Sequence, residues 1–211
     1  MQYGLTNSTP ATVEPVSIIE ARKQVELPAG YTAHDAHLLR LVTAARERFE
    51  MITGRQVVKA TWDLYLDRFP SSSEPIYLPK PPLQSVTSIT YLDTAGVSQT
   101  WSASDYSYST HREPGIVTPA YGEAYPSARW QIDSIRVRYV AGYGPSTSAP
   151  EGIKAAILLL VGHWFDHREE VNVGNIVQEI PTAAAALMDQ YMVGDEFINY
   201  SGRCDSYAEA A

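Results

Sequence analysis

Apolar residues recur every three or four positions in two early parts of the chain, which is the period of an amphipathic helix. In the first part, Ser17 and Glu20 have the S-x-x-E spacing of a capping box, in which each residue satisfies a backbone amide of the other. This spacing predicts a short helix over about residues 18–26. Pro28 and Gly30 then break the pattern.

A longer helical pattern follows and ends at Gly54, because glycine is typical of helix C-termini. Thr32 and Asp35 repeat the spacing of a capping box near its start. The apolar stripe of this segment consists of Leu38, Leu41 or Val42, Ala45, Phe49 and Ile52. Charged residues lie off the stripe, so we expect an amphipathic helix with one buried face.

From Val57 the hydrophobic period falls from 3.6 to 2, which indicates β-strands. The segment TWDLYLD alternates apolar with polar residues, so we expect a strand whose apolar side chains are buried. Its charges, Asp63 and Asp67, are then ordinary residues of the outer face. The segment SIRVRYVAGYG repeats the alternation, and residues rich in turn formers separate the segments. Residues 57–144 are therefore predicted to form an antiparallel β-domain.

The most hydrophobic helix is predicted after Pro150, in the sequence EGIKAAILLLVGHWFDHRE. Its apolar residues nearly encircle it through Val161, so it must be buried on most sides, in the core or against neighbouring subunits. A last helix over about residues 182–192 has an apolar face made of Ala184, Leu187, Met188 and Tyr191.

Together these patterns predict an α+β fold, in which a small bundle of about four helices carries an inserted antiparallel β-domain. The helical domain comprises residues 16–56 and 145–192, and the β-insertion comprises residues 57–144. Residues 1–15 and 193–211 are polar and have no clear period. We therefore expect flexible N-terminal and C-terminal arms.

Composition limits the classes of partner. The 211 residues include 24 acidic and 16 basic residues, so a chain of net charge −8 would be repelled by nucleic acid and by anionic membranes. The single cysteine, Cys204, excludes an intramolecular disulfide and fits a reducing cytosol. The N-terminus lacks the features of a signal peptide, and the most apolar run, residues 155–161, is far shorter than the roughly 20 residues of a membrane span.

One stretch resembles a metal site in its spacing. His163, Asp166 and His167 stand at i, i+3 and i+4, which places three potential ligands on one helix face. A zinc enzyme of the H-E-x-x-H type needs a glutamate directly after the first histidine, but Trp164 occupies that position. The end of a structural helix, with Trp164 and Phe165 buried, explains the stretch more simply. A metal-dependent enzyme that uses His163 and His167 is the alternative.

No other motif predicts catalysis or a cofactor. The stretch AGYGPSTS has the glycines and hydroxyls of a phosphate loop but lacks its lysine, and Cys204 lies in a polar tail without an ordered base. Several tyrosines fall in the turns of the β-region, namely Tyr106, Tyr108, Tyr121 and Tyr125. They are either interface anchors or partners in the strand ladders, and the sequence leaves both open.

Three groups of segments follow one another along the chain. They are SIIEARKQVEL with LLRLVTAARERFEMITGRQVV, then IYLPKPPLQSVTSITYLD, then RVRYVAGYG with APEGIKAAILLLVGHWFDHRE. In this order and spacing they resemble the head-tail connector (adaptor) proteins of long-tailed bacteriophages, the group with a β-insertion between connector helices. The resemblance covers about residues 16–192.

This resemblance implies a structural virion protein without catalytic activity or cofactor. Such proteins form a ring, usually of twelve copies, which lies beneath the portal protein, presents a surface to a stopper or tail protein and continues the DNA channel. The chain would be made in the host bacterial cytoplasm and located at the virion neck, where DNA passes without specific binding. Another ring component of the neck, a stopper or tail terminator, is the alternative.

Eight residues are our candidates for contacts in such a ring. They are His163, Trp164, Arg168 and Glu169 at the end of the apolar helix, Leu187 and Tyr191 on the last helix, and Phe197 and Tyr200 in the C-terminal arm. The two arms extend beyond the region of resemblance. We expect one or both to become ordered against the portal or an adjacent subunit.

Overall fold

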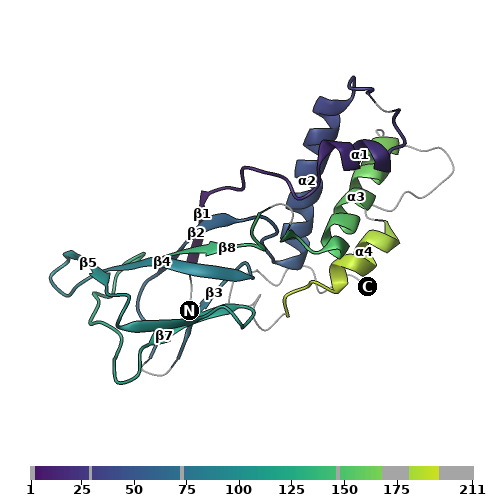
Figure 1. The fold of residues 1–211 in the computed structure, drawn as a ribbon. Helices are drawn as coiled ribbons and strands as arrows, with labels where there is room; N and C mark the ends of the chain where they lie inside the picture. The colour runs from purple at the N-terminus through teal and green to yellow at the C-terminus, as the bar shows by residue number, and fades with distance from the viewer. Residues whose placement is uncertain (1–2, 29, 72–73, 146–147, 168–180, 195–211) are drawn as a thin grey trace, which may run out of the picture. The chain divides into compact units, whose positions relative to one another are not determined.

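The computed structural model describes residues 3–28, 30–71, 74–145, 148–167 and 181–194. The chain divides into two compact units (Figure 1). The helical unit holds Ala11–Lys59 and Tyr143–Met192, and the β unit holds the N-terminal residues up to Pro10 together with Ala60–Gly142. The described residues contain four helices and antiparallel sheets, so the predicted mixed α+β class is confirmed.

The described part of the helical unit contains four helices, of which the first begins as its sequence predicts. They are α1 (Ile18–Gln24), α2 (Asp35–Thr53), α3 (Glu151–Asp166) and α4 (Thr182–Asp189). The Glu20 amide donates to the Ser17 hydroxyl at 3.2 Å, and the Ser17 amide donates to the Glu20 carboxylate at 2.7 Å. The capping box is therefore present, and the hydrogen bond from the Ser17 side chain lowers the pKa of Glu20.

The start of α2 differs from the second capping box that the sequence predicts. His34 is the N-cap residue and makes no side-chain capping bond. Asp35 instead accepts a hydrogen bond from the Arg22 guanidinium at 2.7 Å, because a charged donor competes well with a neutral backbone amide. The predicted end is correct, since Gly54 adopts the left-handed conformation with φ 73°.

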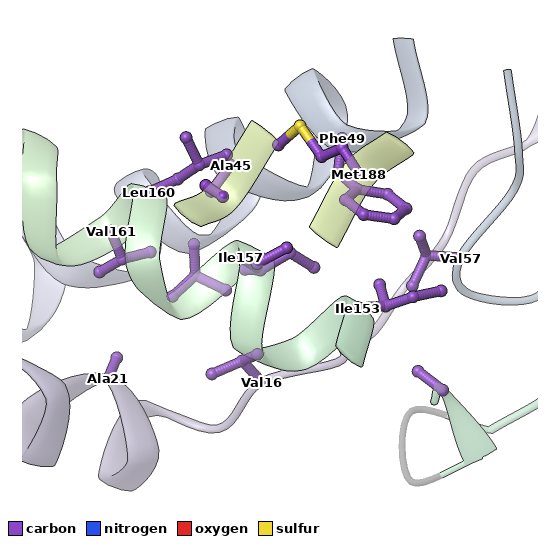
Figure 2. Packing of buried hydrophobic residues seen from close by; sticks show 14 of the residues in the cluster. Val16, Ala21, Ala45, Phe49, Val57, Ile153, Ile157, Leu160, Val161 and Met188 are labelled. Atoms are coloured by element: carbon purple, nitrogen blue, oxygen red, sulfur yellow. The ribbon is translucent and has the colours of Figure 1, made fainter. Parts of the chain in front are cut away.

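Helix α3 lies at the centre of the helical unit, where it packs against α1, α2 and α4. Its residues Ile153, Ile157 and Leu160 are fully buried, and Figure 2 shows them among side chains of the neighbouring helices, including Phe49 and Met188. This position explains why the apolar residues of α3 nearly encircle it. None of the described helices combines the length and the apolar content needed to cross a membrane.

The β unit consists of two antiparallel sheets around a second hydrophobic core. Its strands are β1 (Tyr3–Thr9), β2 (Ala60–Leu66), β3 (Ile76–Leu78), β4 (Leu83–Leu92), β5 (Ser98–Trp101), β6 (Tyr106–Ser109), β7 (Gly115–Pro119) and β8 (Ile135–Ala141). Five strands pair in the order β1-β2-β8-β4-β5, and three pair in the order β3-β7-β6. The alternation in β8 is as predicted, because Ile135, Val137 and Tyr139 are fully buried.

Part of the N-terminal segment that we expected to be a flexible arm is strand β1. It pairs with β2 in the register Tyr3↔Leu66 and Leu5↔Leu64. Tyr3 and Leu5 pack against the core of the β unit, while most other side chains of the strand are exposed. The strand is held mainly by its backbone hydrogen bonds to β2. A polar sequence such as YGLTNST does not predict such pairing.

Asp63 also differs from the expectation of an ordinary outer-face charge, because it is only 3% exposed. It lies opposite Arg138 in the register of β2 and β8. The Arg138 guanidinium donates to both Asp63 carboxylate oxygens, at 2.8 and 2.7 Å. These hydrogen bonds lower the pKa of Asp63, although burial opposes them.

Candidate functional site

The end of α3 carries the histidines whose spacing is typical of a metal site. The rings of His163 and His167 have centroids 4.7 Å apart, and His167 Nδ1 lies 3.0 Å from the His163 carbonyl oxygen. That carbonyl can only accept, so Nδ1 is the donor in this hydrogen bond. Within the described ranges, no group of three or more His, Cys, Asp or Glu residues is arranged to hold a metal ion.

Trp164 and Phe165, next to these histidines, are half-buried and pack against the core of the helical unit. The Phe165 ring meets the rings of His34 and His37 at centroid distances of 5.7 and 6.1 Å. This part of α3 is therefore the packed end of a structural helix, as its sequence suggests. Arg168 and Glu169, our other candidates here, lie outside the described residues.

The two candidates on the last helix face inward in part. Leu187 and Tyr191 are half-buried and pack against the core, and the Tyr191 ring lies 6.1 Å from that of Phe49. Phe197 and Tyr200 lie outside the described residues. Helix α4 ends at Asp189, which is earlier than predicted, and Tyr191 follows it in a turn.

Gly152 in α3 leaves the space that the Tyr191 ring occupies. A Cβ atom at Gly152 would lie 2.6 Å from the Tyr191 hydroxyl oxygen and 3.2 Å from its Cε2 atom. These separations are shorter than a normal contact, so only glycine leaves room for the ring. Gly162 in the same helix differs, because its Cβ would lie 3.4 Å from the flexible Gln24 amide.

We expect Gly152→Ala to destabilise the helical unit by about 1 kcal/mol, since the displaced Tyr191 ring costs more than the gain in helix propensity. Gly162→Ala is the matched control and is expected to stabilise the unit by up to about 1 kcal/mol. Thermal unfolding of both variants measures the difference. Equal stability of the two variants would contradict the role assigned to Gly152.

Arg55 bonds to the backbone of Tyr191 and was not predicted from the sequence. Its Nε atom donates to the Tyr191 carbonyl oxygen at 2.5 Å, and its Nη1 atom donates to the Tyr143 hydroxyl at 3.3 Å. Tyr143 also donates its amide to the Val57 carbonyl oxygen at 3.1 Å. A single arginine after a helix-ending glycine has no periodicity, so no signal in the sequence marks it.

Of the four tyrosines of the β-region that could be interface anchors or internal packing partners, two are packed inside and two are exposed. Tyr106 is buried in the core, and Tyr125 packs in an aromatic cluster with Phe69 and Trp101. Tyr121, by contrast, is fully exposed and Tyr108 is 44% exposed. These latter two remain available as interface anchors.

The most exposed apolar pair among the described residues of the β unit was not predicted from the sequence. Trp130 and Ile132 are 78% and 79% exposed, two residues apart in the loop before β8. The loop is fixed by hydrogen bonds from the Arg129 amide to the Leu92 carbonyl oxygen at 2.9 Å and from the Asp133 amide to the Asp67 carboxylate at 3.0 Å. A rigid, exposed tryptophan is a typical protein-binding feature.

Solved structures with a similar fold come from gene transfer agent particles. A chain in the neck of an empty particle, computed with C6 symmetry, is 20% identical with a TM-score of 0.72, and the match covers 92% of this chain and 96% of that one. A chain in the virion of the native particle is 22% identical with a TM-score of 0.70, covering 90% and 95%. A chain in the native neck, computed with C12 symmetry, is 21% identical with a TM-score of 0.64, covering 92% and 96%.

At identities of 20–22%, these comparisons show a similar fold and nothing further. A comparison with curated proteins finds no match. The model of the head completion protein family matches residues 23–191, which is most of the chain and includes helices α2 to α4 and strands β2 to β8. This chain therefore belongs to the head completion protein family.

Proposed function

We propose that the chain is a structural protein of the virion neck, an adaptor that joins the DNA-filled head to the tail. The observation that supports this most directly is the family match over residues 23–191. The similar chains in gene transfer agent particles, two of them from necks, add a fold of the same kind over nearly the whole length. The family suggests a structural and non-enzymatic role.

In this role the chain forms a cyclic ring, for which we propose twelve copies. The similar neck structures were computed with C6 and C12 symmetry, and both are compatible with a dodecamer. The ring binds the portal protein on one side and a stopper or tail protein on the other. We favour an adaptor over a stopper or tail terminator because the resemblance of the sequence extends over the connector helices.

The charge of the chain suits a ring through which DNA moves. Residues 143–211 contain ten acidic and three basic residues, which accounts for seven of the eight net negative charges. Negative charge lowers affinity for phosphates, so DNA can pass the ring without being retained. The alternative of a metal-dependent enzyme gains no support from the described residues, in which His163 and His167 have no third ligand.

Electron microscopy tests the proposal. We expect negative-stain images of virions that carry a labelled copy of the chain to show the label at the head-tail junction, as part of a ring. A label on the capsid surface or at the distal tail would contradict a neck protein. One zinc per chain in a metal analysis of the purified protein would favour the enzyme instead.

The C-terminal arm supplies a second prediction. Deleting residues 195–211 is expected to weaken attachment to the portal protein, because a polar arm that orders on a partner contributes part of the contact. The truncated chain should keep its helical circular dichroism signal, since the core of the helical unit lies before residue 193. Unchanged affinity for the portal would contradict a role of the arm in docking.

A further inference from the structure

Three segments of the helical unit meet at Arg55, and we call this place the Arg55 junction. The first segment contains Arg55 itself and leads from α2 towards β2. The second contains Tyr143 and leads from β8 towards α3. The third is the turn after α4 that contains Tyr191, from which the chain continues into the C-terminal arm.

The Arg55 guanidinium connects these segments through two of its donors. Nε bonds to the backbone of Tyr191 and Nη1 bonds to the side chain of Tyr143. The first two segments are also joined directly, since the Tyr143 amide donates to Val57 and the Lys59 amide donates to the Gly144 carbonyl oxygen at 3.2 Å. A planar guanidinium holds two acceptors in fixed directions, which the single ammonium of lysine cannot do.

Tyr191 is fixed from its other sides as well. Its ring lies near the Phe49 ring of α2 and against Gly152 of α3, where a Cβ atom would not fit. Its backbone amide donates to the Met188 carbonyl oxygen at 2.9 Å. The point at which the chain leaves the helical unit is therefore set by contacts to the ring, the amide and the carbonyl group of one residue.

We infer that Arg55 is a positioning residue for the C-terminal arm, which it presents to the portal protein from a defined point. This inference rests on the proposed function of the chain as a portal-binding adaptor. An arm that starts from a fixed point loses less conformational freedom on binding than one that starts from a loose end. Arg55 acts through Tyr191 and need not touch the portal itself.

A double-mutant cycle tests the inference, with the purified portal protein from the same virion as the probe. Affinity is measured for the full chain, for Arg55→Met, for the chain without residues 195–211, and for the combination. We expect Arg55→Met to weaken binding about tenfold in the full chain and to have no further effect in the truncated chain. Arg55→Lys should weaken portal binding about as much as Arg55→Met, because lysine keeps the charge but cannot hold two acceptors in the fixed directions of a guanidinium.

Arg48→Met is the matched control, since Arg48 lies on α2 and makes no ion pair or hydrogen bond within the described ranges. Hydrogen exchange supplies a second readout, in which Arg55→Met should speed exchange in residues 182–194 while α2 and α3 stay protected. Loosening of all helices would indicate a merely structural role and would overturn the inference, as would equal losses of affinity in both backgrounds.

The outcomes separate this inference from the proposed function. If truncation weakens portal binding and Arg55→Met does not, the arm docks but Arg55 does not position it. If truncation leaves portal binding unchanged, the docking role of the arm fails and the inference fails with it. A full chain that does not bind the portal at all contradicts the adaptor function itself.

Discussion

Replacing Arg46 with methionine is expected to destabilise the helical unit by about 3 kcal/mol, because it removes the buried cation with which neighbouring carboxylates pair. Arg46 is 8% exposed and lies on the inner side of α2. Its guanidinium donates to Glu14 at 2.7 Å and to Glu50 at 2.8 Å, and Glu47 lies 3.6 Å away. Burial alone would lower the pKa of Arg46, but its carboxylate partners raise it above the ordinary value, so the group stays charged.

The effect should extend to the segment after α2, because Glu50 links it to Arg46. The other carboxylate oxygen of Glu50 accepts from the Gln56 side chain at 2.7 Å and from the Val57 amide at 2.9 Å. Once Arg46 is lost, Glu50 repels Glu14 and these two bonds weaken. Hydrogen exchange should therefore speed up in residues 54–59 as well as in α2.

Urea unfolding followed by circular dichroism measures the change in free energy, with Arg48→Met as control. Arg48 is two residues away on the same helix and only partly buried, and it makes no ion pair with any residue that the structure describes. We expect the control to change stability by less than about 0.5 kcal/mol. If both variants lose the same stability, the loss comes from shortening an arginine on α2 and not from the carboxylates around Arg46.

The parts of the fold that could be predicted are those specified by local patterns. Ser17 with Glu20 marks the start of α1, Gly54 marks the end of α2, and the apolar run of α3 indicates its central position. Each of these signals acts within a few residues of the feature that it predicts. The resemblance to head-tail connector proteins, which depends on the order of several such segments, is confirmed by the family match.

The features that were missed depend on residues far apart in the chain. Strand β1 was expected to be part of an arm because its own sequence is polar, and only the edge of β2 gives it a partner. Arg55 meets Tyr191 across 136 positions, so its role has no local signal. Trp130 is 78% exposed in a loop that hydrogen bonds of Arg129 and Asp133 fix to distant residues, whereas a tryptophan in a sequence is ordinarily expected to be mostly buried.

The burial of Asp63 was also missed for this reason, since it follows from the register of β2 against β8. Alternation along one strand assigns Asp63 to the polar face, and this assignment is correct. It does not reveal that Arg138, on the neighbouring strand, covers the carboxylate. A charge on the outer face of a sheet can therefore be nine-tenths or more buried when a long cation lies across it.

Replacing Arg138 with methionine is accordingly expected to destabilise the β unit at neutral pH, because the buried Asp63 carboxylate loses the partner that donates to both of its oxygens. In the native protein the hydrogen bonds from Arg138 hold the pKa of Asp63 below its usual range. Their contribution is complete above the unfolded pKa of about 4 and is lost as the pH falls through the lower folded value.

The stability of the Arg138→Met variant should respond to the titration of Asp63 in the opposite way to that of the native protein. Without Arg138, burial is the main influence on Asp63 and favours the protonated form, so acid relieves the penalty of the buried charge. The difference in unfolding free energy between native protein and variant should then narrow as the pH falls from 7 towards 4. Urea unfolding at several pH values measures it, and comparison between variants cancels the titration of other carboxylates.

Two further variants decide whether the ion pair between Asp63 and Arg138 is responsible for the loss of stability. Arg136→Met removes a cation two residues away on the same strand face that only adds long-range attraction to Asp63, so we expect a smaller loss. Asp63→Asn combined with Arg138→Met removes the buried charge and should recover part of the stability at pH 7. A loss for Arg138→Met that is independent of pH, and that Asp63→Asn does not reduce, would mean that Arg138 contributes through packing of its aliphatic chain and not through its charge.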